Sequence, residues 1–546
     1  MRRQQQYDDD NDIECHLASV TESWFDKKTG PVYRDDITGE ILDREQVEIA
    51  RRTELEYFRQ MGVYEKVPMK QCTDATQKKP IGVRWVDVVK KDGTHRSRLV
   101  AKEIRKHASP ELFAATPPIE SIKLLLAITA TDRSNVMLHL DVSRAYFYAS
   151  ALRDIFIELP AEDREYDQDG RPLVGKLRQA MYGTRDAAQA WQKEYQSTLR
   201  SLGFVSGQAS PCQFYHPHTK VRAVVHGDDF LFAGKYEALK EVETAFAKKY
   251  RITNQWLGEN HAHSLSILNR LVTWTSHGLE YEGDERHAHR LIEASEVENM
   301  APLTSPCVKS NAEDGEPISD PSLVTKYRGM AARANFMGID RMDVQFAAKE
   351  ASRRMANPTA EDFEKIKRIS RYLNGGRRRV FQVFPWGSSP TTIYAFSDSD
   401  WAGCKRSRKS TSGGVIYWGD ALVKHWSSTQ KSISLSTQES ELYACTKALS
   451  ESMGVKSLLK DFDFVADIVV SIDAKAVHDL AYRTGLGRAR HVETSWLWIQ
   501  QMLEQEKFTI RKIDGDQNPA DLLTKPMDQA KIANLMAIAG LHVRIC

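Results

Sequence analysis

An acidic pair between two apolar runs constrains this chain more than any other feature of its sequence. The segment VRAVVHGDDFLFAG, residues 221–234, has an apolar run on each side of Gly227, Asp228 and Asp229. Two such runs joined by a tight turn predict a β-hairpin with both carboxylates at its tip. A third carboxylate, Asp141, ends the apolar run VMLHLDV, which predicts a short buried strand. Three carboxylates on such rigid platforms could hold two divalent cations for in-line phosphoryl transfer.

Turn chemistry is the alternative explanation of the Asp-Asp pair. Asp is common in tight turns because its short side chain hydrogen-bonds to the neighbouring backbone. The pair alone therefore leaves a structural and a catalytic interpretation open, and the context of the motif has to decide between them.

A second set of acidic residues lies in the last third of the chain. Its members are Asp398 in AFSDSDWAGC, Glu441 in LSTQESELYA, Asp473 in VSIDAKAV and Asp521 in QNPADLLTK. Four carboxylates that hold two Mg²⁺ ions would suit hydrolysis of a phosphodiester, although each residue has a structural explanation when taken alone.

Two positions in this second set have a close acidic neighbour. Asp398 and Asp400 lie two apart on a predicted strand, so both point to one face and spacing does not choose between them. Glu439 and Glu441 lie two apart on a predicted helix and point to nearly opposite sides. Only one of the two glutamates can therefore face a site.

Composition limits the class of protein. The chain has 546 residues, enough for roughly three to four domains. Its 76 Lys and Arg nearly balance 74 Asp and Glu, so any nucleic-acid contact must come from local patches. Candidate patches are 377–379 (RRR) and 405–410 (KRSRKS), although both could equally be ordinary solvated surface. We expect a soluble intracellular protein, cytoplasmic or nuclear, because the seven cysteines form no CxxC pair and no apolar run approaches the ~18 residues of a membrane span.

The first acidic set resembles the reverse transcriptase of Ty1/copia-type retrotransposons. HLDVSRAYFYA, KLRQAMYGTRDAAQAW and VVHGDDFLFAG follow one another as the family's LDVxxAFLxG, LYGLKQAPRxW and YVDDxLxxG motifs do. Upstream, RSRLVAK resembles the family's fingers segment, and FAATPPIESIKLLLA resembles its FxPVxxxxxxRxLLA stretch. The resemblance implies that Asp141, Asp228 and Asp229 bind metal ions and that the aromatic ring of Tyr146 lies beneath the incoming sugar. It also implies that Tyr182 and Gly183 lie under the nucleotide and template, and that the basic residues Arg98 and Lys102 meet phosphates.

Three departures from the family pattern surround these motifs. His226 and Gly227 replace Tyr-Val before the acidic pair, Asp186-Ala187-Ala188 replaces Gln-Ala-Pro, and EIRKH follows RLVAK where GFxQ is usual. None of them removes a metal ligand. The stretch 255–320 matches least.

The second acidic set resembles the family's RNase H. SDSDWAGCKRSRKSTSGG, WSSTQKSISLSTQESELYA, RHVETSWLWI and QNPADLLTKPM are similar to SDADWAGCxxTRRSTSG, WxSKKQxxVSxSSxEAEYxA, KHIxIxxHxxR and QxADxxTKxL. This resemblance favours Asp398 and Glu441 over their neighbours and adds Asp473 and Asp521 as metal ligands. It also implies that His491 assists product release or proton transfer. Each of the two sites would bind two Mg²⁺ ions, or Mn²⁺.

The resemblance implies an α/β (α+β) fold, in which a right-hand polymerase with fingers, palm and thumb precedes a connection and an RNase H-like mixed-sheet domain. We expect a poorly ordered lead-in at residues 1–45, followed by fingers and palm at 46–254 and by thumb and connection at 255–388. The RNase H-like domain is expected at 389–535 and a tail at 536–546. Within the polymerase, KDGT predicts a hairpin turn and SIKLLLAITATDR a buried helix.

The expected partners are an RNA template, a DNA primer, the RNA–DNA hybrid and dNTPs, with no membrane, and the oligomeric state stays open. A zinc knuckle, a protease motif and an integrase motif are missing from the sequence, so we expect a fragment of a longer polyprotein or an element that has lost its front half. The alternative function is a degenerate or domesticated nucleic-acid-binding protein without polymerase activity. A third possibility keeps RNase H activity alone.

Overall fold

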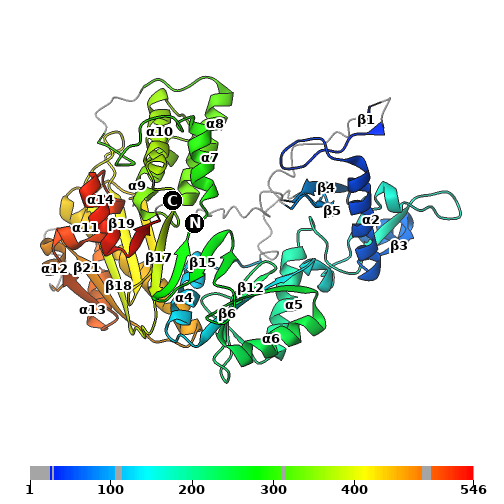
Figure 1. Cartoon of the computed structure of the whole chain (residues 1–546), viewed down its shortest axis with the longest axis horizontal. Helices are drawn as coiled ribbons and strands as arrows, with labels where there is room; N and C mark the ends of the chain where they lie inside the picture. The colour runs from blue at the N-terminus through cyan, green and yellow to red at the C-terminus, as the bar shows by residue number, and fades with distance from the viewer. Residues whose placement is uncertain are drawn as a thin grey trace.

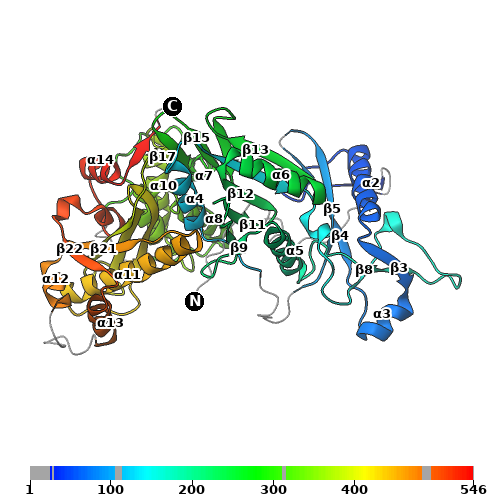
Figure 2. The same cartoon turned by 90° about the horizontal axis from the view of Figure 1, so that it is seen from below.

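The computed structural model describes residues 25–26, 30–90, 92–104, 114–309, 315–482 and 493–544. Figures 1 and 2 show an elongated arrangement, with the segments early in the chain at one end and the sheet of the last 150 or so residues at the other. A six-stranded sheet lies between them.

Two small sheets and two helices form the first end, which corresponds to the expected fingers. Its elements are α2 (Arg44–Gln60), β3 (Tyr64–Pro68), α3 (Met69–Thr76), β4 (Val83–Val89), β5 (His95–Ala101), β7 (Phe156–Glu158) and β8 (Leu173–Leu177). The chain turns back between Val89 of β4 and His95 of β5, where the segment KDGT predicts a hairpin turn. A separate pair of two-residue strands, β1 (Phe25–Asp26) and β2 (Gly30–Pro31), precedes these elements.

The expectation that residues 1–45 are poorly ordered is wrong for residues 31–43, which pack against β4. The carboxylate of Asp35 accepts a hydrogen bond from the Val89 backbone N–H at 2.8 Å, and the Asp36 N–H donates to the Asp87 carbonyl at 2.9 Å. Leu42 is buried. Polar turn residues therefore order this segment, because the edge of β4 supplies partners for them that the sequence alone does not reveal.

The six-stranded sheet corresponds to the palm and has the order β13-β6-β12-β11-β10-β9, all antiparallel. Its elements are β6 (Asn135–Val142), β9 (Val205–Ser206), β10 (Gln213–Tyr215), β11 (Arg222–His226), β12 (Asp229–Lys235) and β13 (Ile252–Leu257), with the short helix η2 (Ala145–Tyr148) after β6. The helices α5 (Ala187–Ser201) and α6 (Tyr236–Lys249) pack on one face, against Leu138, Leu140 and Val142 of β6. Since side chains alternate along a strand, Asp141 points to the other face.

The helix α4 (Ile119–Ala130) covers that other face away from the acidic residues. It is buried along almost its whole length, as the apolar segment predicts, because it packs at once against the palm and against two further sheets. Its one basic residue, Lys123, is also buried; its ammonium lies 4.0 Å from Asp340 and over the ring of Tyr281.

A five-stranded sheet follows the palm in the order β14-β15-β16-β17-β23, all antiparallel. Its strands are β14 (Ser264–Ile267), β15 (Arg270–Trp274), β16 (Gly278–Glu282), β17 (Val380–Pro385) and β23 (Leu541–Val543). The expected tail at 536–546 is therefore wrong, since β23 pairs with β17 across most of the last domain. The short sequence of β23 carries no strand pattern of its own, and the pairing depends on the exposed edge of β17.

Four helices are inserted between β16 and β17 and share a core of their own. They are α7 (Arg286–Ser295), α8 (Pro321–Met337), α9 (Met342–Ser352) and α10 (Ala360–Asn374). Asp320 caps α8 at its N-terminus, and Thr359 and Asp362 cap α10 reciprocally. The region expected as thumb and connection, 255–388, thus consists of this helical cluster and most of the five-stranded sheet.

The last sheet has the order β20-β19-β18-β21-β22 and is mixed, with β18, β21 and β22 parallel to one another. Its strands are β18 (Thr392–Asp400), β19 (Thr411–Trp418), β20 (Ala421–Thr429), β21 (Asp467–Ile472) and β22 (Thr509–Lys512). Its helices are α11 (Thr437–Asp461), α12 (Lys475–Ala481), α13 (Glu493–Glu504) and α14 (Gln529–Ile538). The short helices η5 (Gly515–Gln517) and η6 (Pro519–Leu523) lie between β22 and α14, whereas η3 (Ala161–Asp163) lies between β7 and β8. The long helix α11 packs on β18, and this mixed sheet lies where the resemblance implies an RNase H-like domain.

The C-terminal end of α11 docks on the palm. The carboxylate of Asp461 accepts hydrogen bonds from the backbone N–H groups of Gln208, Ala209 and Ser210, at 2.9 to 3.2 Å. A Cβ on Gly207 would overlap this carboxylate. We call this contact the Asp461 clasp.

The fold class predicted from the sequence is confirmed: an α/β (α+β) chain with a palm sheet followed by a mixed-sheet domain. Within the described part of the chain, none of the helices combines the length and apolar character needed to span a membrane.

Candidate active sites

The palm brings its three carboxylates to one end of the sheet. Asp141 near the end of β6 lies directly opposite Asp229 at the start of β12. Asp228 precedes Asp229 in the turn, and the Val142 N–H donates to its carbonyl oxygen at 3.1 Å. All three residues are half-buried. This geometry follows from the register of two neighbouring strands.

A two-residue turn carries the acidic pair. His226 pairs with Asp229, which leaves Gly227 and Asp228 as the loop, and Gly227 has a φ of 61°. A two-residue hairpin with glycine first and φ above zero matches the right-handed twist of the strands. The indole N–H of Trp191 on α5 donates to the Gly227 carbonyl at 2.8 Å and so fixes the turn from below.

His139 is a palm residue that sequence analysis did not single out. Its Nε2 lies 2.7 Å from Oδ1 of Asp229. Its position two residues before Asp141 on the same strand was the available signal, because such spacing places both side chains on one face. The imidazole orients one of the candidate metal ligands.

Three of the residues expected around the nucleotide, Arg98, Tyr146 and Tyr182, lie together beside this end of the sheet. The guanidinium of Arg98 stacks over the Tyr182 ring at 4.8 Å, and the Tyr146 ring centroid is 4.8 Å from that of Tyr182. Burial raises the pKa of Tyr182 to about 12, and Asp228 adds to the rise. Lys102 directly follows β5, and its backbone N–H donates to the Gly82 carbonyl.

Gly183 is required by the backbone. Its φ is +81°, and a Cβ there would overlap the carbonyl oxygen of Ala101 on β5. Only glycine combines that conformation with such a close approach. The palm and the fingers therefore meet here through bare backbone.

Two of the departures from the family pattern share one partner. The guanidinium of Arg153 lies 2.6 Å from Glu103 of the EIRKH segment and 3.2 Å from Asp186 of the Asp-Ala-Ala segment. Glu103 also accepts the Arg185 N–H at 2.9 Å. The replacements thus form one ion-paired group at the start of α5.

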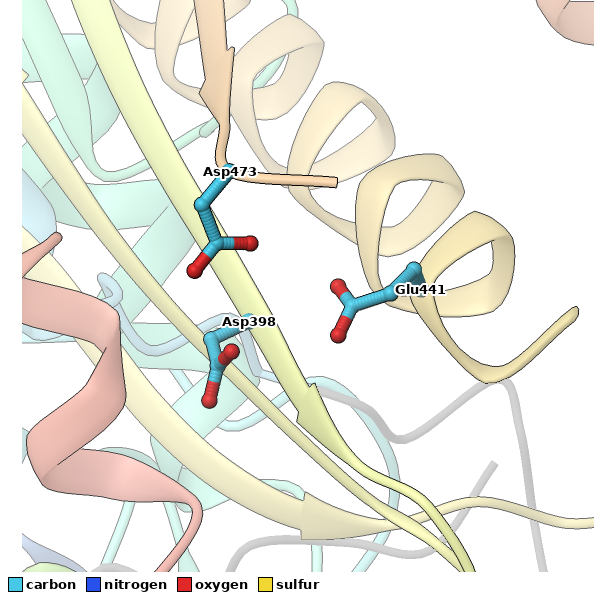
Figure 3. Close-up of side chains that lie close together, drawn as sticks. All are labelled: Asp398, Glu441 and Asp473. Atoms are coloured by element: carbon cyan, nitrogen blue, oxygen red, sulfur yellow. The ribbon is translucent and has the colours of Figure 1, made fainter. Parts of the chain in front are cut away.

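The RNase H-like sheet gathers Asp398, Glu441 and Asp473 at the C-terminal ends of β18 and β21 (Figure 3). One carboxylate oxygen from each lies within 4.8 Å of the others. Glu441 reaches the group from the first turns of α11. Parallel neighbouring strands end at the same edge of a sheet, which is why residues far apart in sequence meet here.

The structure distinguishes the acidic neighbours that spacing could not. Asp400 is tied down elsewhere, because its carboxylate accepts the Thr411 backbone N–H. Glu439 accepts the Leu435 N–H at 2.7 Å and the Tyr443 hydroxyl at 3.1 Å. Neither belongs to the group of three carboxylates.

Mutual repulsion and burial disfavour charge in this group. Burial raises the pKa of Asp398, and the Asp521 carboxylate raises it further. Burial, together with Asp398 and Asp473, also raises the pKa of Glu441. The pKa of Asp473 is raised by burial and by Asp521.

Asp521 itself stands beside the group, paired with two lysines. Its carboxylate lies 2.8 Å from the Lys525 ammonium and 3.2 Å from that of Lys531. Lys525 is also 3.8 Å from Asp398, and Thr524 donates a hydrogen bond to Asp398. Sequence analysis missed Thr524 and Lys525, although they follow the PADLL motif directly. His491 lies outside the described residues.

The donor set fits a hard divalent cation. All three groups offer carboxylate oxygens, which Mg²⁺ and Mn²⁺ prefer. The Oε2 atom of Glu441 is buried without a hydrogen-bond partner, and such an atom calls for a cation or water.

The two basic patches differ. In the first, Arg377 stacks on Tyr372, Arg378 donates to Asn374 at 2.6 Å, and Arg379 pairs with Glu282. In the second, the side chains of Lys405, Arg406 and Arg408 are exposed beside the end of β18.

Comparison with known proteins gives one family. Residues 69–266 match the family model described as reverse transcriptase (RNA-dependent DNA polymerase). The retrovirus-related Pol polyprotein from transposon TNT 1-94 of Nicotiana tabacum is 25% identical, over 92% of this chain and 38% of that protein. Transposon RE1 of Arabidopsis thaliana encodes one that is 26% identical, over 84% and 32%. This chain thus spans about a third of the length of these relatives.

Two solved structures are similar to the chain at low identity. They are the foamy viral protease-reverse transcriptase in complex with RNA/DNA hybrid (TM-score 0.45, 12% identity, 87% of this chain and 54% of that one) and in complex with dsDNA (TM-score 0.47, 11% identity, 92% of each).

The family model and the transposon relatives lead to one conclusion. Residues 69–266 match the reverse transcriptase family, and the chain is similar over most of its length to the Pol polyproteins of Ty1/copia-type retrotransposons.

Proposed function

We propose that this chain is an RNA-directed DNA polymerase with ribonuclease H activity, and that each activity has its own acidic centre. The observation that carries the proposal is the presence of two acidic groups on two sheets within one chain of this family. The polymerase centre is Asp141, Asp228 and Asp229. The RNase H centre is Asp398, Glu441 and Asp473, with Asp521 beside it.

Register supports the polymerase centre. Asp141 and Asp229 are direct cross-strand neighbours, and Asp228 sits in a turn held by Trp191. In the proposal, Arg98 and Lys102 meet phosphates, Tyr182 and Gly183 support the nucleotide and template, and Tyr146 lies beneath the sugar. A ring in that place would clash with a 2′-hydroxyl and so select dNTPs.

Electrostatics support the RNase H centre. Three carboxylates with raised pKa values at one sheet edge are a costly arrangement unless a cation neutralises them. A pair of Mg²⁺ ions, when bound, supplies charge neutralisation and an activated oxygen nucleophile at each centre. Asp398, Glu441 and Asp473 would hold them here, and Lys525 keeps Asp521 and Asp398 oriented. An RNA template, a DNA primer and their hybrid are the proposed substrates.

The departures from the family pattern fit an intact protein better than a decaying one. Glu103 and Asp186 would each leave a charge unpaired if they had changed at random, yet both pair with Arg153. The rival function, nucleic-acid binding without catalysis, is one outcome of the test below.

The test measures both activities in one preparation. Primer extension on an RNA template with Mg²⁺ compares wild type with Asp228→Asn, and cleavage of the RNA in an RNA–DNA hybrid compares wild type with Asp398→Asn. Each variant is the control for the other, because Asp228→Asn should still cleave and Asp398→Asn should still extend. Extension that is absent from the wild type would overturn the polymerase half, and cleavage that survives Asp398→Asn would overturn the RNase H assignment.

A further inference from the structure

A small apolar patch lies exposed beside the RNase H centre. Trp401 follows Asp400 directly, and 49% of its surface is exposed. Its indole N–H donates to the Ser434 carbonyl at 3.0 Å. Ile433 and Leu435, on either side of Ser434, are 51% and 68% exposed. We call Trp401, Ile433 and Leu435 the Trp401 patch.

A buried polar network holds the loop under this patch. The amide of Gln430 donates to the Ser412 hydroxyl at 3.0 Å and to the Ser440 carbonyl at 2.9 Å, and its oxygen accepts from the Ser434 hydroxyl at 2.7 Å. Glu439 holds the Leu435 N–H. These hydrogen bonds fix the loop, so the Ser434 carbonyl that the indole bonds cannot turn inward. The indole of Trp401 therefore stays exposed.

The same network reaches the catalytic carboxylates. The hydroxyl of Ser399 donates to that of Ser440 at 2.9 Å, and its backbone N–H donates to Glu441 at 3.2 Å. The Trp401 patch and Glu441 are thus carried by one rigid unit, the end of β18 with the start of α11. Anything that the patch binds is positioned relative to the acidic centre.

The surroundings of the patch point to a polyanion. Lys431 precedes it, and the exposed side chains of Lys405, Arg406 and Arg408 follow Trp401 in the next loop. A protein partner would need an interface of about 1,000 Å² or more, mostly uncharged at its centre. Three apolar side chains with exposed lysines and arginines in the adjoining loop segments suit the sugar and base edges of a duplex with phosphates on either side.

We propose that the Trp401 patch contacts the RNA–DNA hybrid in its shallow minor groove, with the indole face against sugar and base edges, and so sets the position of the scissile phosphate at the RNase H centre. The inference rests on the proposed RNase H function, and it makes Trp401 a positioning residue.

The experiment uses the full chain and a fluorescein-labelled RNA–DNA hybrid. In the cleavage-silent Asp398→Asn background, fluorescence anisotropy compares Trp401→Ala, Trp401→Phe and Leu435→Ser. Loss of one buried aromatic contact predicts an affinity about tenfold weaker for Trp401→Ala, substantial recovery for Trp401→Phe, and a smaller loss for Leu435→Ser. The matched control is Val465→Ala, because Val465 is 84% exposed at the opposite end of β21 from Asp473.

In the cleavage-competent chain, Trp401→Ala should raise KM for the hybrid and shift the cut sites, while kcat and primer extension stay near wild type. Equal binding and equal cut sites for Trp401→Ala and wild type would overturn the inference. So would a variant that binds hybrid normally but changes the oligomeric state. A wild-type chain that binds hybrid through Trp401 and never cleaves it would instead contradict the proposed function alone. Leu435→Ser keeps the test valid if Trp401→Ala fails to fold, because Leu435 is largely exposed.

Discussion

Removing one carboxylate from the RNase H centre should stabilise the metal-free protein. In Asp398→Asn, the variant keeps the size of the side chain and loses its charge. The ligand oxygens of Asp398, Glu441 and Asp473 lie within 4.8 Å of one another. Two unit charges at that distance repel by about 3 kcal/mol at an effective dielectric constant of about 20. The lost attraction to Lys525, at 3.8 Å, offsets part of this relief. We expect a net gain of about 2 kcal/mol.

The sign of the effect depends on pH. A carboxyl whose pKa is raised by folding destabilises the folded state increasingly as pH rises above its unfolded value, until the folded pKa is passed. Asp398→Asn should therefore match wild type near pH 4 and exceed it in stability near neutral pH, as long as divalent cations are absent. Saturating Mg²⁺ should reverse the order, because it binds only the folded site and binds the intact carboxylates better.

Thermal unfolding in EDTA and in Mg²⁺, at about pH 5 and about pH 8, measures both effects. The control is Asp420→Asn, an exposed aspartate in the turn between β19 and β20 of the same sheet; it should be neutral in all four conditions. A variant less stable than wild type in EDTA at both pH values would refute the electrostatic reasoning. Equal stabilisation of both proteins by Mg²⁺ would show that the ion binds elsewhere.

Three further variants test other parts of the molecule. Gly183→Ala should lower the melting temperature and the soluble yield severely, because its Cβ would overlap the Ala101 carbonyl. Its control is Gly454→Ala on α11, where a Cβ meets nothing within 4 Å; this variant should leave the free energy of unfolding unchanged or raise it by up to about 1 kcal/mol. Equal losses of stability in both variants would contradict the prediction. Trp191→Phe removes the donor to the Asp228 turn and should slow primer extension up to about tenfold without changing hybrid cleavage; an unaffected extension rate would mean that the turn holds itself. Asp461→Ala removes the hydrogen bonds of the Asp461 clasp between α11 and the palm. Calorimetric unfolding should then split into two transitions, with each activity retained. A single unchanged transition would show that other contacts couple the two halves.

Local sequence patterns predicted the elements that carry the acidic residues. The apolar runs in VMLHLDV and VRAVVHGDDFLFAG were enough for the three strands β6, β11 and β12, because each strand is buried against helices. The uniformly apolar α4 was also readable, since a helix without a polar face must be enclosed. Family motifs then supplied the order of the acidic residues, which periodicity alone does not give.

Contacts between distant segments were beyond local reasoning. The order around residues 31–43 depends on Asp35 meeting Val89 of β4, and β23 depends on the free edge of β17. Spacing could not separate Asp398 from Asp400; only the Thr411 backbone, folded back beside β18, shows which of them is engaged. The same holds for His139 and Lys525, whose importance comes from what they touch.

The pairing of β23 with β17 bears on the order in which the protein can assemble during synthesis. Some 155 residues separate the two strands in the chain, so β17 leaves the ribosome well before its partner exists. Its hydrogen-bonding edge stays open while the whole RNase H-like sheet is being made, and open edges invite pairing with other chains. The five-stranded sheet that joins the two halves is consequently the last to be completed. A chain cut short before Leu541 would lack β23 and its contact with β17, although it would still contain every carboxylate of both centres.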